Sequence, residues 1–135
     1  MNADRETVNA PGAPPAIGSY SHAVIVDLRS AGGLLFCSGQ IPLDPATGEL
    51  VGETAAEQAR RCLENLRAVC EAAGASLGRA VRLTIYMTDL DAFTAVNEVY
   101  GSFFEEDPPA RVTVGVSQLP RGAQVEIDAI VALPS

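Results

Sequence analysis

The sequence contains no lysine and only one histidine, His22. Because all nine basic residues are arginines, the chain cannot form a Schiff base through a lysine of its own, and it cannot hold a phosphate-binding loop that ends in Gly-Lys-Ser/Thr. A single histidine also cannot supply a multi-histidine zinc site. These absences exclude several enzyme classes.

Cysteines are few, and long apolar runs are missing. The three cysteines, Cys37, Cys62 and Cys70, are odd in number and form no Cys-x-x-Cys pair, which is typical of a reduced, cytoplasmic setting. The longest wholly apolar runs span a few residues, such as 129–134, whereas a membrane helix needs about 20. We therefore expect a cytoplasmic protein without a membrane span.

Basic residues are fewer than acidic residues: nine against seventeen give a net charge of −8 at pH 7. Phosphate backbones repel a chain this acidic, and no basic run is longer than Arg60-Arg61, so we expect no nucleic-acid partner. The length of 135 residues and the hydrophobic fraction of 47% predict one domain with a packed core.

The apolar periodicity predicts five strands and two helices. The strands are expected at 21–28, 34–38, 81–87, 112–116 and 123–133, with helices at 54–73 and from Asp89 or Asp91 to Phe104. Thr54 and Glu57 have the spacing of a helix capping box. The first two strands look like a β-hairpin that turns at 30–33. Residues 1–14 are expected to form a flexible arm before a single domain at 15–135.

The order strand–strand, helix, strand, helix, strand–strand predicts an α+β fold in which a single layer of mixed sheet carries both helices on one face. Two helices cannot cover both faces of such a sheet. Self-association is the simplest cover for the other face.

Alternation along the last two strands places four polar side chains together. If the valines of 112–116 and the apolar residues of 125–131 meet the helices, then Arg111, Thr113, Glu126 and Asp128 share the face that the helices leave bare. A cation beside carboxylates and a hydroxyl is a plausible group for anion binding and acid–base chemistry. The same pattern also fits an exposed sheet face with salt bridges.

Four other residues allow two interpretations each. His22 is either a general base near neutral pH or a surface or capping residue. Tyr20 is either a hydrophobic staple or a phenol that lines a cleft, and Asn97 is either an exposed helical residue or a polar contact of the site. Cys37 is reactive only beside a cation or a helix N-terminus, and otherwise it is a buried thiol.

Four sequence blocks resemble motifs of the RidA/YjgF family of reactive-intermediate deaminases. They occur in the order and with the spacing of that family, and the resemblance runs from about residue 14 to residue 132. The blocks are 15–23 (PAIGSYSHA), 38–48 (SGQIPLDPATG), 109–111 (PAR), and 119–123 with 125–127 (LPRGA and VEI).

This resemblance implies a chorismate-mutase-like α+β fold, assembly as a homotrimer, and active sites in clefts between subunits. It also implies hydrolysis of enamine and imine intermediates of the 2-aminoacrylate and 2-iminopropanoate type to 2-keto acids and ammonia, without a metal or organic cofactor. Such an enzyme is a 2-iminobutanoate/2-iminopropanoate deaminase. The alternative is a non-catalytic member of the same fold that binds a small carboxylate.

By position, the resemblance makes Arg111 the ligand of the substrate carboxylate and Glu126 the residue that orients or activates water. Tyr20, Ser38 and Asn97 match other cleft positions, and the backbone around Gly39 resembles the family's binding loop. Thr113, which can donate a hydrogen bond, is a further candidate for substrate binding. The chain departs from the most active branch of the family at Val112 and Thr113, where that branch tends to have a small hydroxyl residue and then cysteine.

Overall fold

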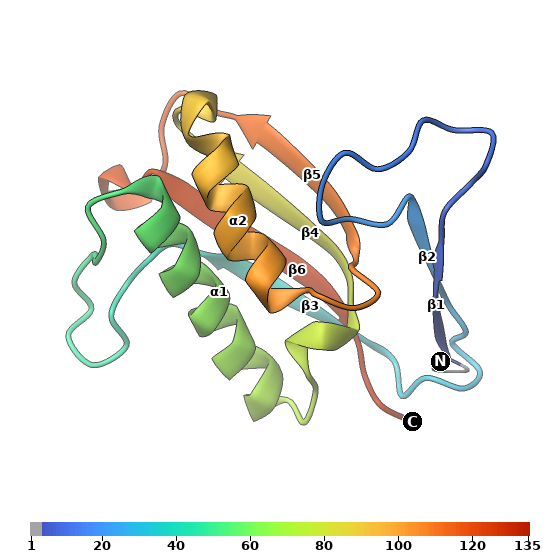
Figure 1. The fold of residues 1–135 in the computed structure, drawn as a ribbon. Coiled ribbons are helices and arrows are strands. Elements are labelled where there is room, and N and C mark those ends of the chain that lie inside the picture. The colour runs from blue at the N-terminus through green and yellow to red at the C-terminus, as the bar shows by residue number, and fades with distance from the viewer. Residues whose placement is uncertain (1–3) are drawn as a thin grey trace.

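The computed structural model describes residues 4–135, and its main body is a four-stranded sheet with two helices side by side on one face (Figure 1). The sheet order is β3-β6-β4-β5; β4 and β5 are parallel, and the other neighbours are antiparallel. The expected α+β class and the placement of both helices are therefore confirmed. The elements are β1 (Arg5–Val8), β2 (Ala23–Val26), β3 (Leu34–Gln40), α1 (Ala55–Ala72), β4 (Ala80–Met87), α2 (Phe93–Phe103), β5 (Ala110–Gly115) and β6 (Val125–Ala132).

Helix α1 begins at the predicted capping box. The Thr54 hydroxyl accepts a hydrogen bond from the Glu57 amide at 3.1 Å, and the Glu57 carboxylate accepts one from the Thr54 amide at 3.1 Å. These two bonds satisfy backbone donors that the first turn of a helix leaves free. Gly74, with a φ of 73°, follows the end of the helix, where a left-handed residue commonly stops a helix.

Helix α2 begins after a one-turn 3₁₀ helix, Leu90–Ala92, which Asp89 caps by accepting a hydrogen bond from the Asp91 amide at 3.0 Å. Asp89 therefore caps the short turn and not α2 itself. The fully buried side chains of α2 are Val96 and Tyr100. Within residues 4–135, neither helix is long and apolar enough to cross a bilayer.

The core lies between the helices and one face of the sheet. Buried side chains of β4 and β6, such as Leu83, Ile85 and Ile127, pack against the apolar stripe of α1. The opposite face, which we call the open face, carries Phe36, Val112, Val114, Glu126 and Asp128. Phe36 is 70% exposed, and the two valines are 37% exposed. This face retains apolar surface that the described chain does not cover.

The predicted β-hairpin of 21–28 and 34–38 is wrong. Strand β2 pairs with β1 in a separate two-stranded sheet, and β3 pairs with β6. The connection from Val26 to Leu34 is much longer than the two-residue loop that favours a hairpin. The end of this connection is bound to the C-terminal segment of the chain, since the Gly32 amide donates a hydrogen bond to the Leu133 carbonyl at 3.2 Å.

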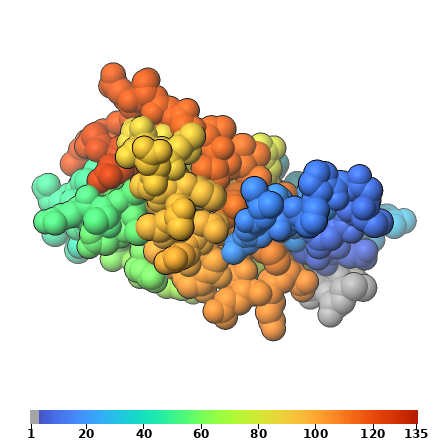
Figure 2. Space-filling model, turned by 45° about the horizontal axis from the view of Figure 1, so that its top comes forward, coloured from blue at the N-terminus to red at the C-terminus, as the bar shows by residue number. Residues whose placement is uncertain are grey.

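The expectation of a flexible arm at 1–14 is wrong for residues 5–8, which form strand β1. Residues 1–3 lie outside the described residues. Arg5 is buried, and its guanidinium donates to the Ala80 carbonyl at 2.9 and 2.6 Å and to the Asp107 carbonyl at 3.1 Å. Asp4 and Arg79 form an ion pair at 2.9 Å. The N-terminal segment (blue in Figure 2) packs beside the rest of the molecule through these contacts.

We expect Arg5→Ala to lower the free energy of unfolding by about 1.5–3 kcal/mol, because charged hydrogen bonds to the buried Ala80 carbonyl and the Asp107 carbonyl are lost. Urea unfolding at a fixed protomer concentration measures the change. Arg29→Ala is the control, since the Arg29 side chain is 92% exposed beside Asp27, and such a pair contributes at most about 1 kcal/mol. Equal midpoints for the two variants would show that Arg5 does not anchor β1.

Candidate functional site

The site residues expected from the sequence fall into two groups on opposite faces of the sheet. The arginine group lies on the helix side around Arg111, and the glutamate group lies on the open face around Glu126. Tyr20, Asn97 and Thr113 belong to the arginine group, and Ser38 and Gly39 belong to the glutamate group.

Arg111 is held in a cage of aromatic rings at the edge strand β5. Its guanidinium carbon lies 5.3 Å from the centre of the Tyr20 ring, 5.3 Å from that of Phe93 and 4.9 Å from that of Tyr100. Its Nη1 donates to Oδ1 of Asn97 at 2.7 Å. Cation–π contacts and one charged hydrogen bond therefore fix the position of the guanidinium.

The cage leaves most donors of Arg111 available. A guanidinium has five N–H groups, and the Asn97 bond is the one hydrogen bond that Arg111 makes within residues 4–135. Burial lowers its pKa, although the nearby Tyr100 and Tyr20 oppose that shift. Arginine stays charged at neutral pH despite such a shift, so this group is suited to binding a carboxylate through two parallel N–H bonds.

The chain makes room for this cation at Gly18. A β-carbon at that position would lie 2.8 Å from Nη2 of Arg111, closer than carbon and nitrogen atoms pack. A hollow of about 500 Å³ lies along the edge strand β5 and is lined by Tyr20, His22, Arg82 and Arg111, among others. There is therefore space for a small molecule next to Arg111.

Two hydroxyl groups are buried here without a hydrogen-bond partner in the described chain, those of Tyr100 and Thr113. Burial raises the pKa of Tyr100, while the charge of Arg111 acts in the opposite direction. Tyr100 therefore remains a neutral phenol beside the cation. Unpartnered buried hydroxyls are costly and are often found at functional sites.

The glutamate group is built around a β-bulge in β3. Cys37 lies opposite Ala129, and Gln40 lies opposite Ile127, so Ser38 and Gly39 together face one residue of β6. A bulge interrupts the ladder and leaves backbone groups free to bind a ligand. The Glu126 carboxylate packs directly over Gly39, and a β-carbon at Gly39 would overlap it. Within residues 4–135, Glu126 forms no hydrogen bond or ion pair through its side chain.

If Glu126 activates water, as the family resemblance implies, Gly39→Ala should lower the turnover of imine hydrolysis by about ten- to a hundredfold, because its methyl group must push the Glu126 carboxylate aside and displacements near 1 Å have effects of this size. The free energy of unfolding should change little, since the end of a flexible side chain can rotate away. Steady-state kinetics and urea unfolding measure both quantities. Gly12→Ala is the control, because open space surrounds Gly12; equal turnover in the two variants would contradict the proposed role of this contact.

Asp128 shares the open face with Glu126 but is already engaged. Its carboxylate accepts a hydrogen bond from the Tyr86 hydroxyl at 2.8 Å, and this bond is the main reason that the pKa of Tyr86 is raised. Glu126 is therefore the freer of the two carboxylates.

The prediction that Arg111, Thr113, Glu126 and Asp128 share one face is wrong for β5. Arg111 pairs with Leu83, which is fully buried under the helices, whereas Val112 and Val114 face away. Glu126 and Asp128 do lie on the open face. Arg111 and Glu126 are two strands apart and three residues apart along the sheet, roughly 10 Å in each direction. One chain does not bring them together.

His22 and the cysteines have structural surroundings. Nδ1 of His22 accepts from the Ala10 amide at 2.8 Å, and Nε2 lies 2.7 Å from the Pro14 carbonyl. Both nitrogens are therefore in use, which supports the capping interpretation over a general base. Cys62 and Cys70 are fully buried, and burial raises the pKa of each thiol to about 12. Burial also raises the pKa of Cys37, so it is not an activated thiolate.

Phe93 and Tyr100 were not expected at the site. Their signal is in the helical spacing, because residues 93, 97 and 100 lie on one face of α2. This spacing places Asn97 beside two aromatic rings and resolves its two interpretations in favour of a polar contact. In the described part of the chain, no three His, Cys, Asp or Glu side chains gather as metal ligands.

The family model described as Endoribonuclease L-PSP matches residues 10–133. The chain belongs to this family. It is the RidA/YjgF family that the sequence blocks resemble, so that interpretation is confirmed. Residues 10–133 include both groups of site residues.

Curated relatives carry several names. Protein DfrA of Myxococcus xanthus is 56% identical over 93% of this chain and 94% of its own. The RutC family protein y4sK of Sinorhizobium fredii is 47% identical over 95% and 98%. The human 2-iminobutanoate/2-iminopropanoate deaminase is 38% identical over 93% and 88%.

Solved structures of relatives have the same fold. YyfB of the Rid protein family from Yersinia pestis aligns with a TM-score of 0.86 at 31% identity, over 96% of this chain and 99% of its own. RidA from the Antarctic bacterium Psychrobacter sp. PAMC 21119 aligns with a TM-score of 0.72 at 41% identity, over 95% and 99%. The family and its fold are therefore established for this chain.

Proposed function

We propose that this L-PSP family protein hydrolyses reactive 2-imino acids, of the 2-iminopropanoate type, to 2-keto acids and ammonia. The observation that carries the proposal is the caged guanidinium of Arg111, which is fixed by Asn97 and three rings while most of its donors remain free. Relatives that are named 2-iminobutanoate/2-iminopropanoate deaminases, at 38–40% identity, support this choice of substrate.

In the proposed reaction, two N–H groups of Arg111 bind the substrate carboxylate and orient the imine carbon. Glu126 accepts a proton from a water molecule, whose oxygen attacks that carbon, and passes this proton to the imine nitrogen, so that the C=N bond becomes a carbinolamine. Glu126 then accepts the proton of the new hydroxyl group and passes it to the amine; the C–N bond breaks, and ammonia leaves as the C=O bond of the keto acid forms. 2-Aminoacrylate enters as its imine tautomer, so water is the only co-reactant.

We propose that the complete site forms between two copies of the chain. Arg111 and Glu126 lie on opposite faces, and the open face carries uncovered apolar side chains, including Phe36 at 70% exposure. A neighbouring copy that covers this face can place its own Arg111 opposite Glu126. The expected assembly is a homotrimer with three equivalent sites.

Light scattering in dilute neutral buffer should give a mass about three times that of the 14.1 kDa chain, as expected for a closed cyclic trimer. Phe36→Glu places a charge on the apolar open face and should shift the mass toward that of the monomer. A stable monomer of the parent chain would contradict both the assembly and a site shared between copies.

The activity is tested by generating 2-aminoacrylate with a separate lyase and measuring how much faster the keto acid and ammonia appear when this protein is added. Acceleration supports hydrolysis. If no acceleration occurs but titration calorimetry shows that pyruvate binds, the chain is the alternative, a small-carboxylate binding protein without turnover.

The remaining expectations concern partners and setting. The family name refers to RNA cleavage, but the net charge of −8 disfavours binding to a phosphate backbone, and we propose a small-molecule partner only. The free thiols of Cys37, Cys62 and Cys70 support a reduced, cytoplasmic setting.

A further inference from the structure

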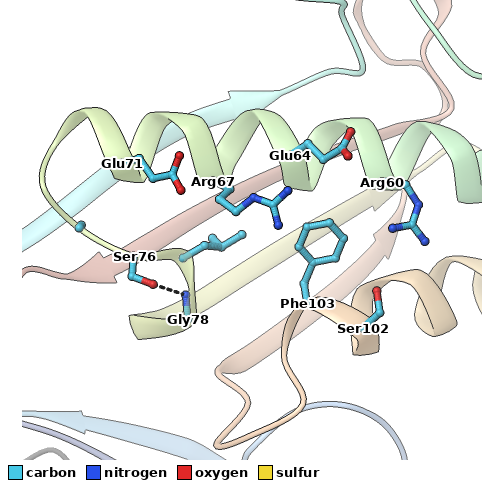
Figure 3. A pocket seen from close by; sticks show the side chains of 10 residues that line it. Arg60, Glu64, Arg67, Glu71, Ser76, Gly78, Ser102 and Phe103 are labelled. Carbon is cyan, nitrogen blue, oxygen red and sulfur yellow. Dashed lines mark hydrogen bonds between the residues drawn. The ribbon is translucent and has the colours of Figure 1, made fainter.

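We propose that a groove between α1 and the end of α2 binds a small organic dianion, a molecule with two acidic groups on a short carbon chain (Figure 3). The groove has a volume of about 350 Å³, which is within the range of small-molecule sites. It shares no residue with the arginine group or the glutamate group. Its ligand is therefore distinct from the substrate proposed above.

Two arginines of α1 reach into this groove over one aromatic ring. Arg60 and Arg67 are seven residues apart, which is about two helical turns, so they lie on the same face. Their guanidinium carbons are 6.0 and 5.2 Å from the centre of the Phe103 ring, and Figure 3 shows the ring between the two groups. The two cations therefore lie at one ring, and their attraction to its π-electrons partly offsets the repulsion between like charges.

Neither cation has an anionic partner. Within residues 4–135, the guanidinium groups of Arg60 and Arg67 form no hydrogen bond or ion pair. Glu64 also lines the groove, but its carboxylate is paired with Arg61 at 3.3 Å. The groove thus presents two unpaired forks of N–H donors in a chain whose net charge is −8, and a planar carboxylate fits such a fork.

The shape of the groove favours two acidic groups over one. Both guanidinium groups flank a single ring, and their side chains start about 10 Å apart along α1. We therefore expect a short carbon chain across the ring to bring one acidic group to each fork, and a single phosphate or carboxylate to engage one fork. The ring of Phe103 offers an apolar surface to the carbon chain of such a ligand. The buried side chain of Leu77 also lines the groove. Ser76 accepts a hydrogen bond from the Gly78 amide at 3.3 Å, and its own O–H remains free to donate.

Replacement of Glu71 provides a second test, in which ligand affinity is expected to increase and not to decrease. Glu71 also lines the groove, and its carboxylate repels a dianion. A ligand with two acidic groups and no amine should therefore bind more tightly to Glu71→Gln, whereas a ligand that uses an ammonium group should bind more weakly.

The test is an NMR titration of the full chain with glutarate at constant ionic strength, in the parent and in an Arg111→Ala background that removes the other carboxylate fork. We expect saturable shifts of the Gly78 and Ser102 amides in both. Arg67→Gln and Arg60→Gln should each weaken binding by about tenfold or more, as the loss of one charge-assisted contact requires. Arg29→Gln, which removes an equal charge elsewhere, should leave the dissociation constant unchanged.

Titrations with butyrate and with inorganic phosphate show whether the groove prefers a ligand with two acidic groups over one with a single acidic group. Butyrate and phosphate should each bind at least about tenfold more weakly than glutarate, because each engages one arginine. Equal affinity for butyrate or phosphate would overturn the proposal, as would weaker glutarate binding in Glu71→Gln or the absence of saturable shifts at the two amides. None of these outcomes bears on imine hydrolysis, which is measured at Arg111 and Glu126.

Discussion

Glu126→Gln should lower turnover by about a hundred- to ten-thousandfold, the usual contribution of a general base. The amide keeps the shape of the carboxylate and its packing over Gly39, but it cannot accept a proton from water. Assembly and binding of a non-reactive keto acid should therefore be retained. Single-substrate kinetics, light scattering and titration calorimetry measure the three properties on one preparation.

Asp128→Asn is the matched control for this prediction. Asp128 lies two residues from Glu126 on the same strand face, but its carboxylate already accepts the Tyr86 hydroxyl. Its replacement should leave turnover within a few-fold of the parent. If Asp128→Asn is the slower variant and Glu126→Gln turns over like the parent, water is activated by Asp128 and the role given to Glu126 is wrong.

Arg111→Ala should weaken binding or slow the reaction by about ten- to a hundred-and-fiftyfold, which corresponds to the loss of roughly 1.5–3 kcal/mol from a charge-assisted contact. Arg111→Lys should restore little, because an ammonium group lacks the planar fork that matches a carboxylate. In both variants, kcat/KM and the affinity for a keto acid should decrease together, as steady-state kinetics and titration calorimetry would show.

Arg121→Ala controls for the removal of one positive charge. Arg121 is exposed, and the one hydrogen bond that its side chain makes within residues 4–135 runs from Nη2 to the Gly48 carbonyl at 3.4 Å. Its replacement should leave activity unchanged. An Arg111→Ala protein that folds, assembles and keeps full activity would reduce Arg111 to a structural residue of the aromatic cage.

Local sequence signals predicted the helices well. The capping box at Thr54 and Glu57 acts within a few residues, so it is readable from the sequence and is present in the structure. Strand partners are chosen over long distances, and no local signal connects residues 5–8 with residues 23–26. The pairing of β1 with β2 and the buried guanidinium of Arg5 could not be predicted for this reason.

The prediction of which side of β5 faces the helices is wrong for a different reason. Alternation shows which residues share a face, but it does not show which face meets the helices. The valines were assigned to the core, yet Val112 and Val114 face outward, and Arg111 lies inward among aromatic rings. Because β5 carries apolar side chains on the side away from its own helices, its alternation fits either orientation of the strand, and this makes the assignment ambiguous.

The residue types of the site were predicted, but their arrangement was not. The family resemblance pointed to Arg111, Asn97 and Glu126, whereas the separation of Arg111 from Glu126 depends on strand order and register. The cage residues Phe93 and Tyr100 were hidden among the apolar residues of α2, where a core position and a site position follow the same periodicity.

The central claim is that Arg111 of one copy and Glu126 of another form one site, and mixed assemblies test it most directly. Arg111→Ala and Glu126→Gln chains, each nearly inactive alone, are co-expressed with different tags, and the mixed oligomers are isolated and assayed for imine hydrolysis. If the sites are shared, one of the three sites in each isolated mixed trimer recovers both native side chains, and activity should rise to about a third of that of the parent. Activity that stays at the level of the separate variants would contradict the account.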